Sequence, residues 1–232
     1  MKIALIGYGK MGRMIKKVSE SRGHSIVACI TSGQWDVEGI LKADVCMEFT
    51  SPESVLDNIR RLAKLKKPIV IGTTGWNDNI ECVRSLVEEN QTAAVYSSNF
   101  SVGVNLMFEI LEQASKIMNN YVQYDVAGID YHHREKKDSP SGTAMEMARV
   151  VEENMERIDR MPLSSIRCGS IPGIHTVLFD SLCDTISITH EARNREGFAQ
   201  GAVQAAEWVL ERKGLYTFSD CLRTLIQKVA KK

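Results

Sequence analysis

The stretch Lys2-Ile-Ala-Leu-Ile-Gly-Tyr-Gly-Lys-Met-Gly12 decides the fold of this chain. Its first five residues form a short, mostly apolar run that is typical of a buried strand, and a helix-like segment follows the glycines. A Gly-x-Gly-x-x-Gly turn between a strand and a helix is the fingerprint of a dinucleotide-binding β-α-β unit, because its glycines let the backbone approach a pyrophosphate. We therefore predict a cofactor diphosphate at this turn, held by Gly7, Gly9, Lys10, Met11 and Gly12.

Strand-like and helix-like segments alternate from this turn onward. Short apolar segments at 25–30, 43–49, 68–71 and 93–96 are each followed by a turn, and most of them by a helical pattern. This alternation predicts an α/β domain of the Rossmann type, with a doubly wound parallel sheet. Ligands bind such sheets at the carboxyl ends of the strands. The Gly, Thr, Ser and Asn residues that stand there are therefore candidate ligand contacts.

The end of the second strand carries small hydroxyl side chains where NAD-binding sheets usually carry an acid. Thr31 and Ser32 stand there, and the next acid in the chain is Asp36. A carboxylate at that place binds the ribose hydroxyls of NAD, whereas small hydroxyls leave room for the 2′-phosphate of NADP. We expect Thr31 and Ser32 to contact NADPH or NADH, with a preference for NADPH. The alternative is that both residues merely end the strand.

The pattern changes after about residue 103. A helix-like segment at 106–118 leads to a long alternating strand at 121–131, and further alternating runs lie at 175–179 and 184–190. Closely spaced alternating strands predict an open mixed sheet with one covered face, and hence a smaller α+β domain.

Two domains follow from this change of pattern. We place the dinucleotide-binding domain at 1–103, with a helical segment at about 195–232 that returns to it. The substrate-binding and oligomerisation domain is placed at 104–194.

The composition excludes several classes of protein. Lys+Arg and Asp+Glu number 29 each in 232 residues, so no net charge favours nucleic acid or a membrane surface. The sequence has no run approaching the ~20 apolar residues of a membrane span, and its N-terminus lacks the layout of a signal peptide. Six scattered cysteines without a CxxC pair indicate reduced thiols. We therefore expect a cytoplasmic protein in which any anion binding is local.

A second motif runs from His132 to Ala144, with the sequence His-His-Arg-Glu-Lys-Lys-Asp-Ser-Pro-Ser-Gly-Thr-Ala. It places two imidazoles and several cations just before a proline-punctuated turn that opens onto a helix. The first backbone N–H groups of a helix lack partners within the helix and can bind a carboxylate or phosphate. Titratable donors beside such an anion seat are what an enzyme needs to hold a small acid and protonate it.

Together with the N-terminal Gly-Tyr-Gly-Lys-Met-Gly-Arg, this motif resembles the dihydrodipicolinate reductase family. The resemblance runs nearly end to end, and its further matches are Gly72-Thr-Thr-Gly75, Ser98-Asn-Phe-Ser-x-Gly103 and the segment from His190 to Ala202. The chain departs from the family pattern at Glu48, where a member would often have Asp, and in shorter loops around 33–42 and 157–172.

The resemblance implies that nicotinamide hydride reduces 4-hydroxy-tetrahydrodipicolinate to tetrahydrodipicolinate, in the diaminopimelate and lysine pathway. His132 would donate the proton, since an imidazole titrates near pH ~6.5. Lys136 would be the competing or cooperating acid, because an ammonium stabilises negative charge on the ring nitrogen. The residues implied in binding the small dianionic substrate are His133, Lys136, Ser141, Gly142 and Thr143.

The resemblance also extends the cofactor site and implies an assembly. The further residues implied in cofactor binding are Phe49, Thr50, Gly72, Thr73, Thr74, Ser98, Asn99, Phe100, Arg195 and Phe198. The family pattern implies a homotetramer built through the sheets of the second domain.

Other interpretations of these residues stay open. Thr143 and Glu146 fit a capping box, so Thr143 could cap a helix without touching substrate. No metal is expected, because adjacent histidines of a strand point apart and nothing nearby in the sequence completes a zinc spacing. His175 and His190, in alternating strands, are more typical of structural or interface positions.

The rival functions are another NAD(P)-dependent dehydrogenase on the same scaffold and a non-enzymatic NAD(P)-binding sensor.

Overall fold

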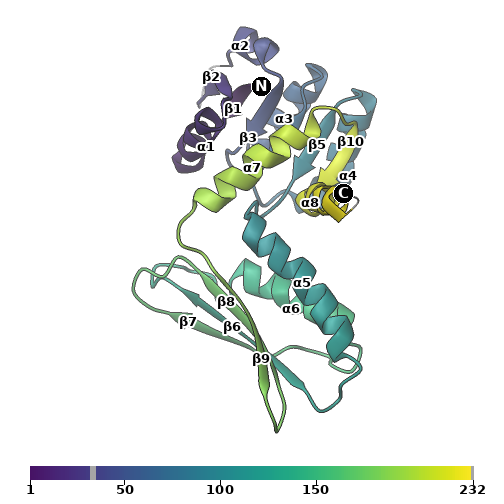
Figure 1. Ribbon diagram of the computed structural model, residues 1–232. Helices are drawn as coiled ribbons and strands as arrows, with labels where there is room; N and C mark the ends of the chain where they lie inside the picture. Colours follow the sequence, from purple (N-terminus) through teal and green to yellow (C-terminus); the bar gives the residue numbers. More distant parts are fainter. Residues whose placement is uncertain (32–34, 231–232) are drawn as a thin grey trace. The chain divides into compact units, whose positions relative to one another are not determined.

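The computed structural model describes residues 1–31 and 35–230, and it divides into two compact units. Unit 1 contains residues 1–102 and the residues from 196 on, and unit 2 contains Gly103–Arg195. The chain therefore leaves unit 1, builds unit 2 and returns to unit 1 (Figure 1).

A six-stranded sheet forms the centre of unit 1. Its strands are β1 (Lys2–Ile6), β2 (Ser25–Ile30), β3 (Val45–Glu48), β4 (Ile69–Ile71), β5 (Ala93–Tyr96) and β10 (Gly214–Thr217). They lie in the order β10-β5-β4-β3-β1-β2, and all the strand pairs are parallel. The strand order reverses beside β1, and this reversal brings the carboxyl ends of β1 and β3 together.

Helices cover both faces of this sheet. One apolar layer joins it to α1 (Lys10–Ser21), α7 (Glu196–Val209) and α8 (Phe218–Ala230). The other layer joins it to α2 (Val37–Lys42), α3 (Val55–Lys64) and α4 (Ile80–Glu89), the last preceded by the short 3₁₀ helix η1 (Asn77–Asn79). The predicted doubly wound Rossmann-type sheet is thereby confirmed.

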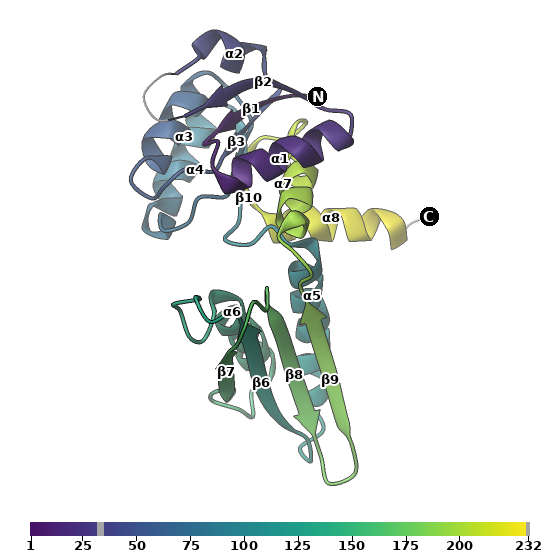
Figure 2. The same ribbon diagram turned by 90° about the vertical axis from the view of Figure 1, so that its left-hand side faces the viewer.

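Unit 2 contains a four-stranded sheet with one covered face. Its strands are β6 (Asp125–His132), β7 (Leu163–Arg167), β8 (Ile174–Asp180) and β9 (Thr185–Glu191), in the order β7-β6-β8-β9. The pair β6–β7 is parallel and the other two pairs are antiparallel, so the predicted mixed sheet is confirmed. The helices α5 (Val102–Met118) and α6 (Gly142–Asn154) lie behind the strands in Figure 2 and bury an apolar layer against them.

Several local predictions were wrong. The segments that form α2 and β7 were expected to be loops, the strand β10 was not predicted, and β6 begins at Asp125 rather than at Tyr121. Tyr121 closes a turn instead, because its carbonyl accepts a hydrogen bond from the Tyr124 amide at 3.1 Å.

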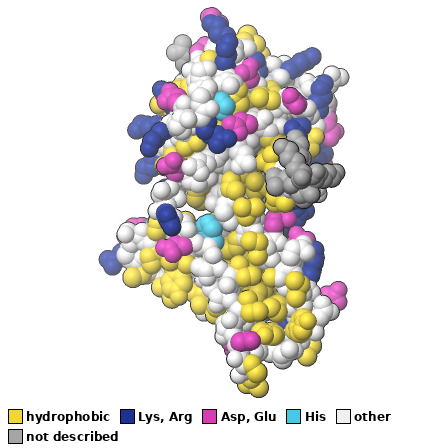
Figure 3. All heavy atoms as spheres, in the orientation of Figure 1, with side chains coloured by type: hydrophobic (Ala, Val, Ile, Leu, Met, Phe, Trp, Pro, Cys, Tyr) yellow, Lys and Arg dark blue, Asp and Glu magenta, His cyan; other side chains and the backbone are white. Residues whose placement is uncertain are grey.

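The surface agrees with the balanced charge of the sequence. Figure 3 shows basic and acidic side chains interspersed over the visible face of the molecule, with apolar side chains gathered over unit 2. The outward side of α5 contributes to this apolar surface through Leu106, Ile110 and Ile117. Within the described part of the chain, no helix is long and apolar enough to cross a bilayer.

Candidate active site

The glycine turn after β1 has a geometry that only glycine satisfies. Gly7 has φ +94°, and a Cβ atom there would lie 2.1 Å from the Phe49 carbonyl oxygen. A Cβ atom at Gly12 would lie 2.3 Å from the Gly7 oxygen, so the helix packs directly on the turn. Around Gly9, by contrast, a Cβ atom would meet nothing within 4 Å among the described residues. The turn is therefore tight on its inner side and open where a ligand would approach.

The N-terminus of α1 has the properties of an anion seat. Gly9 is its N-cap, and within the described chain no side chain caps the helix and no acid lies in its first turn. The first amide groups of α1 are therefore available to a phosphate, and the helix dipole favours a negative charge there. Lys10 is exposed at the same place. The geometry of these residues is compatible with the diphosphate of a dinucleotide.

A buried carboxylate organises the ends of β3 and β4. Glu48 is fully buried and accepts hydrogen bonds from the Thr50 hydroxyl and from Asn58 Nδ2, the latter at 3.0 Å. The Thr50 amide in turn donates to Thr73 Oγ1 at 2.7 Å. Burial raises the pKa of Glu48, although the hydrogen bonds from Thr50, Thr73 and Asn58 oppose this shift. Glu48 thus fixes Thr50 and Thr73 to one another rather than facing a ligand.

The other residues predicted to bind the cofactor differ in their exposure. A Cβ atom at Gly72 would lie 2.0 Å from the Phe49 ring, so this strand end also requires glycine. Phe100 is buried against Phe218, with ring centroids 5.0 Å apart, and belongs to the core. Thr31, Thr74, Ser98 and Arg195 are exposed, and Met11, Asn99 and Phe198 are half-buried. Ser32 lies outside the described residues.

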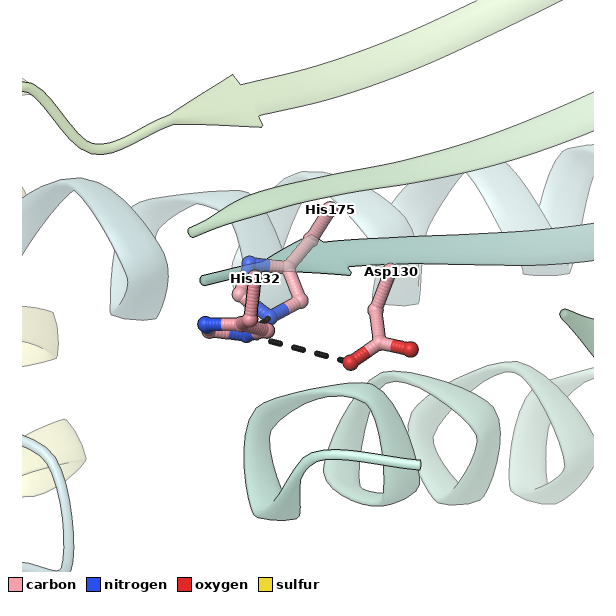
Figure 4. A group of neighbouring side chains, drawn as sticks. All are labelled: Asp130, His132 and His175. Carbon is pink, nitrogen blue, oxygen red and sulfur yellow. Dashed lines mark hydrogen bonds and ion pairs between the residues drawn. The ribbon is translucent and has the colours of Figure 1, made fainter. Parts of the chain in front are cut away.

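Strand register gathers the titratable groups of unit 2. Asp130 pairs with His175 across β6 and β8, and His132 pairs with Arg167 across β6 and β7. Because side chains alternate along a strand, Asp130 and His132 share the face that α6 covers. Asp130, His132 and His175 are all buried, and Figure 4 shows them converging from neighbouring strands.

The distances within this cluster are those of a hydrogen-bonded network. His132 Nε2 lies 3.3 Å from His175 Nε2 and 3.8 Å from Asp130 Oδ2. Asp130 Oδ2 accepts from the Ser141 amide at 3.1 Å and from Arg167 Nη2 at 3.2 Å. The Ser141 hydroxyl lies 3.2 Å from His175 Nε2. The cluster thus connects three strands to the first turn of α6.

These surroundings shift the pKa values of the buried groups. Burial lowers the pKa of His132, the nearby Lys136 charge lowers it further, and Asp130 opposes both. Burial and the neighbouring His132 lower the pKa of His175 to about 4. Burial raises the pKa of Asp130, but its polar surroundings, which include the hydrogen bonds from the Ser141 amide and Arg167, outweigh burial and hold that pKa below its usual range. At neutral pH the site therefore contains a carboxylate and two neutral imidazoles.

The start of α6 differs from the predicted capping box. Ser141 is the N-cap, and its hydroxyl accepts from the Ala144 amide at 3.1 Å. Thr143 is the second residue of the helix, so the alternative in which it is the N-cap does not hold. Ser141 takes that role because the chain turns from extended to helical at this residue. Gly142, the first helical residue, is exposed.

An internal carboxylate occupies part of the expected anion seat. Asp138 accepts from the Lys136 ammonium at 2.7 and 2.8 Å and from the Gly142 amide at 3.4 Å. Those two donors are among the groups that the sequence assigned to a substrate carboxylate. His133 is half-buried on the same loop, and its carbonyl accepts from the Lys136 amide at 3.1 Å. The loop therefore holds the predicted substrate donors close together.

Three groups of the cluster could in principle ligate a metal ion. The nearest ligand atoms of Asp130, His132 and His175 all lie within 4.8 Å of one another. Asp130 Oδ2, however, already accepts from the Arg167 guanidinium, and a cation there would be repelled by it. These three residues are therefore better suited to sharing protons through hydrogen bonds than to binding a metal ion.

Sequence reasoning missed Asp130, His175 and Arg167. His175 was expected at a structural or interface position, but its ring lies against that of His132, with centroids 5.2 Å apart. The signal available in the sequence was the alternation of the strands, which puts Asp130 on the same face as His132. The positions of Arg167 and His175 beside His132 follow only from the pairing of β6 with β7 and β8, which the sequence does not reveal.

Comparisons with known proteins place this geometry in context. Models of the dihydrodipicolinate reductase N-terminus and C-terminus match residues 1–100 and 103–222, respectively. A 4-hydroxy-tetrahydrodipicolinate reductase of Christiangramia forsetii is 37% identical over 241 residues, covering 98% of this chain and 100% of the relative. One of Thermosipho africanus is 34% identical and covers 96% of this chain and 98% of its own.

A solved structure has a similar fold. The dipicolinate-bound dihydrodipicolinate reductase from Paenisporosarcina sp. TG-14 superposes with a TM-score of 0.82. It covers 94% of this chain and 97% of its own at 22% identity, so this likeness concerns the fold.

Proposed function

The chain belongs to the dihydrodipicolinate reductase family, and from that premise we infer that it reduces 4-hydroxy-tetrahydrodipicolinate to tetrahydrodipicolinate in the diaminopimelate and lysine pathway. Reductases of this family use NADH or NADPH, and the N-terminal domain binds the nucleotide. The chemistry supplied by the bound cofactor is hydride transfer to ring carbon 4, after water has left from the 4-hydroxy form. Binding, orientation and proton transfer fall to residues of the chain.

The diphosphate seat is the turn at Gly7–Gly12. Its support is the uncapped N-terminus of α1 and the open space around Gly9. Beside it, the ends of β3 and β4 offer Thr50 and Thr74 to the ribose and nicotinamide. Glu48 orients this edge by accepting from the Thr50 hydroxyl.

The substrate carboxylates bind at the start of α6 and the loop before it. Their donors are the amides of Gly142 and Thr143 together with His133 and Lys136. Support comes from Asp138, whose carboxylate already accepts from Lys136 and from the Gly142 amide. Each charge-assisted hydrogen bond of this kind contributes roughly 1.5–3 kcal/mol, so two or three can hold a dianion on a protein without net charge.

His132 donates the proton that completes the reduction, and Lys136 cooperates with it. The lowered pKa of His132 matches this role only when the substrate is bound. A dianion beside the imidazole favours its charged form and raises its pKa toward neutrality, so proton uptake accompanies substrate binding.

The observation that carries this proposal is the convergence of His132, Lys136 and the N-terminus of α6 within one charge-coupled cluster. Its test is a coupled assay in which dihydrodipicolinate synthase generates the substrate and NADH or NADPH is oxidised. Oxidation of either nucleotide, inhibited competitively by pyridine-2,6-dicarboxylate, is the expected result. Nucleotide binding without turnover would instead support a sensor.

We predict that His132→Ala lowers kcat by about 10²–10⁴ while the Kd for the nucleotide stays the same. The reason is that the imidazole supplies the proton and lies in unit 2, outside the predicted diphosphate seat. Stopped-flow turnover and nucleotide fluorescence titration measure the two quantities. Loss of nucleotide affinity with unchanged kcat would refute the role of His132.

We also propose that the enzyme works as a cytoplasmic homotetramer. The open face of the unit 2 sheet carries Ile129, Tyr131, Ile166 and Leu178, and an uncovered apolar face of this kind is typical of an interface. The cysteines are free, as expected in a reducing compartment. Light scattering after gel filtration should give four chains, and Leu178→Glu should give fewer.

A further inference from the structure

We propose that His175 is a positioning residue of the reductase, whose Nε2–H donates to His132 Nε2 and sets which nitrogen of His132 receives the catalytic proton. The inference rests on the proposed function in assigning proton transfer to His132. It adds a partner that holds His132 in one tautomer and one orientation.

The contact between the two rings requires a shared proton. Their Nε2 atoms lie 3.3 Å apart in a buried site, so one nitrogen donates and the other accepts. His132 also cannot swing away on its other side, because Gly173 packs against it. A Cβ atom at Gly173 would lie 2.9 Å from His132 Cε1. The pair is therefore confined as well as close.

The remaining partners decide which ring donates. The Pro172 backbone favours the charged form of His132, as a nearby acceptor does, and a proline backbone has no N–H to donate. Because Nε2 of His132 is the nitrogen that faces His175, we place the ring proton of His132 on its other nitrogen, Nδ1. In the neutral imidazole this leaves His132 Nε2 as the acceptor. His175 must then carry its proton on Nε2.

The environment of His175 supports the same assignment. Its Nδ1 is buried and has no hydrogen-bond partner among the residues that the structure describes, so a proton there would be an orphaned donor. A proton on Nε2 can instead reach both His132 Nε2 and the Ser141 hydroxyl, at 3.3 and 3.2 Å. We therefore assign the ring protons to Nδ1 of His132 and Nε2 of His175, because this arrangement gives each N–H an acceptor.

This arrangement has a consequence for proton transfer. A donor that faces His132 Nε2 stabilises the neutral ring, so it opposes premature protonation in the empty site. The charged groups around His132 are Asp130 on β6, Lys136 on the loop before α6 and Arg167 on β7, and His190 on β9 faces His175. Of these groups, Asp130 favours the imidazolium, and Lys136 and Arg167 oppose it. His175 adds a directional contact that these longer-range charges do not supply.

The test compares two substitutions at one position. His175→Leu removes the donor, whereas His175→Gln keeps an N–H near the same place but cannot titrate. We expect His175→Leu to lower kcat 10- to 100-fold, as for other residues that orient a reacting group. The basic limb of the pH profile of kcat should move to higher pH, because His132 is easier to protonate. His175→Gln should restore most of kcat and return the limb toward its original position.

A matched control separates this role from general packing. His190→Gln makes the same substitution at the residue that pairs with His175 in β9. It should leave the basic limb where it is. Equal kcat losses in the Leu and Gln variants, without a moved limb, would overturn the proposal, because loss of packing alone predicts that result.

A measurement on the unmodified enzyme does not depend on the folding of any variant. In protein labelled with ¹⁵N-histidine at pH 8, NMR should show His132 protonated at Nδ1 and His175 protonated at Nε2. The opposite tautomers would overturn the inference while leaving the turnover assay untouched. Conversely, absence of turnover in the coupled assay would defeat the proposed function, and the NMR result would still report on the histidine pair.

Discussion

We expect cofactor preference to depend on single residues at the end of β2. Thr31 is exposed there, and Asp36, the first acid that follows, accepts from the Gly39 amide at 2.8 Å as the N-cap of α2. The acid nearest to the expected ribose position is therefore engaged in capping a helix. This arrangement leaves a place for the 2′-phosphate of NADPH without charge repulsion.

We predict that Thr31→Asp weakens NADPH relative to NADH by at least tenfold. A carboxylate at this position repels the 2′-phosphate and can accept from the ribose hydroxyls of NADH. The ratio of kcat/KM for the two nucleotides measures the effect, and Thr31→Asn is the uncharged control. An unchanged ratio would show that residue 31 lies away from the 2′ position.

At the scale of single elements, the loop before α6 contains a carboxylate that would compete with a substrate at the proposed binding site. Asp138 neutralises Lys136 and accepts from the Gly142 amide, and the Lys136 hydrogen bond lowers the pKa of Asp138. A substrate carboxylate must displace this internal carboxylate or share its donors. The helix start is therefore ordered before substrate arrives.

We predict that Asp138→Asn lowers the Ki of pyridine-2,6-dicarboxylate about threefold to tenfold. The amide has no charge to hold Lys136, so the ammonium is released to the ligand. Inhibition assays at fixed nucleotide concentration give the Ki, and Glu135→Gln on the same exposed loop is the control. A weaker inhibitor in the Asp138 variant would mean that the carboxylate helps to build the seat.

The elements differ in how well local sequence predicts them. The glycine turn and β1 were predictable, because Gly7 and Gly12 leave no room for a Cβ atom. The strands β7 and β10 were not, since Leu163–Arg167 and Gly214–Thr217 are short and partly exposed and become strands only by pairing with β6 and β5. Arg167 was missed for this reason. His132 and Lys136 are candidates from their motif alone, and Asp138, the partner of Lys136, lies in the same motif, but His175 and Arg167 near His132 needed the strand register.

At the scale of the whole molecule, one ion-pair cluster ties the returning segment to the start of the chain. Glu207 on α7 accepts from Arg22 at 2.7 and 3.0 Å and from His24 at 2.7 Å. The His24 ring also lies 3.3 Å from the N-terminal amino group. A bidentate pair of this kind is stronger than a typical surface salt bridge.

We predict that Glu207→Gln lowers the free energy of unfolding by about 1 kcal/mol, because Arg22 loses its charged partner. Urea denaturation at low salt measures the change. The same substitution at the exposed Glu211 is the control and should have little effect. A loss that is as large at ~1 M NaCl as at low salt would argue against an electrostatic origin.

Acid should destabilise the folded chain through its buried histidines. The pKa of His175 is lowered to about 4, and burial also lowers the pKa values of His132 and His190. Below pH ~6.5 these histidines bind protons in the unfolded chain but stay neutral in the folded chain. The free energy of unfolding is therefore at its full value above that pH and decreases toward pH 4. For His175, whose folded pKa lies well below the unfolded one, the slope approaches about 1.4 kcal/mol per pH unit between the two values.

We predict that His175→Gln lowers by about one the number of protons that the chain takes up when it unfolds in acid. The free energy of unfolding should therefore fall less steeply as the pH is lowered. Denaturation midpoints at pH 7, 5.5 and 4.5 would show a shallower decline than in the unmodified protein. A decline of the same steepness would mean that His175 is already protonated in the folded state.

The return of the chain to unit 1 has a consequence for biosynthesis on the ribosome. β10 forms the edge of the sheet and α7 covers one of its faces, yet both are translated after the whole of unit 2. The nascent nucleotide-binding unit must therefore emerge with an apolar face unprotected until α7 and β10 leave the exit tunnel. Unit 2 is built from one contiguous segment and can therefore complete its folding first. The unit whose synthesis begins first is thus the last to complete its fold.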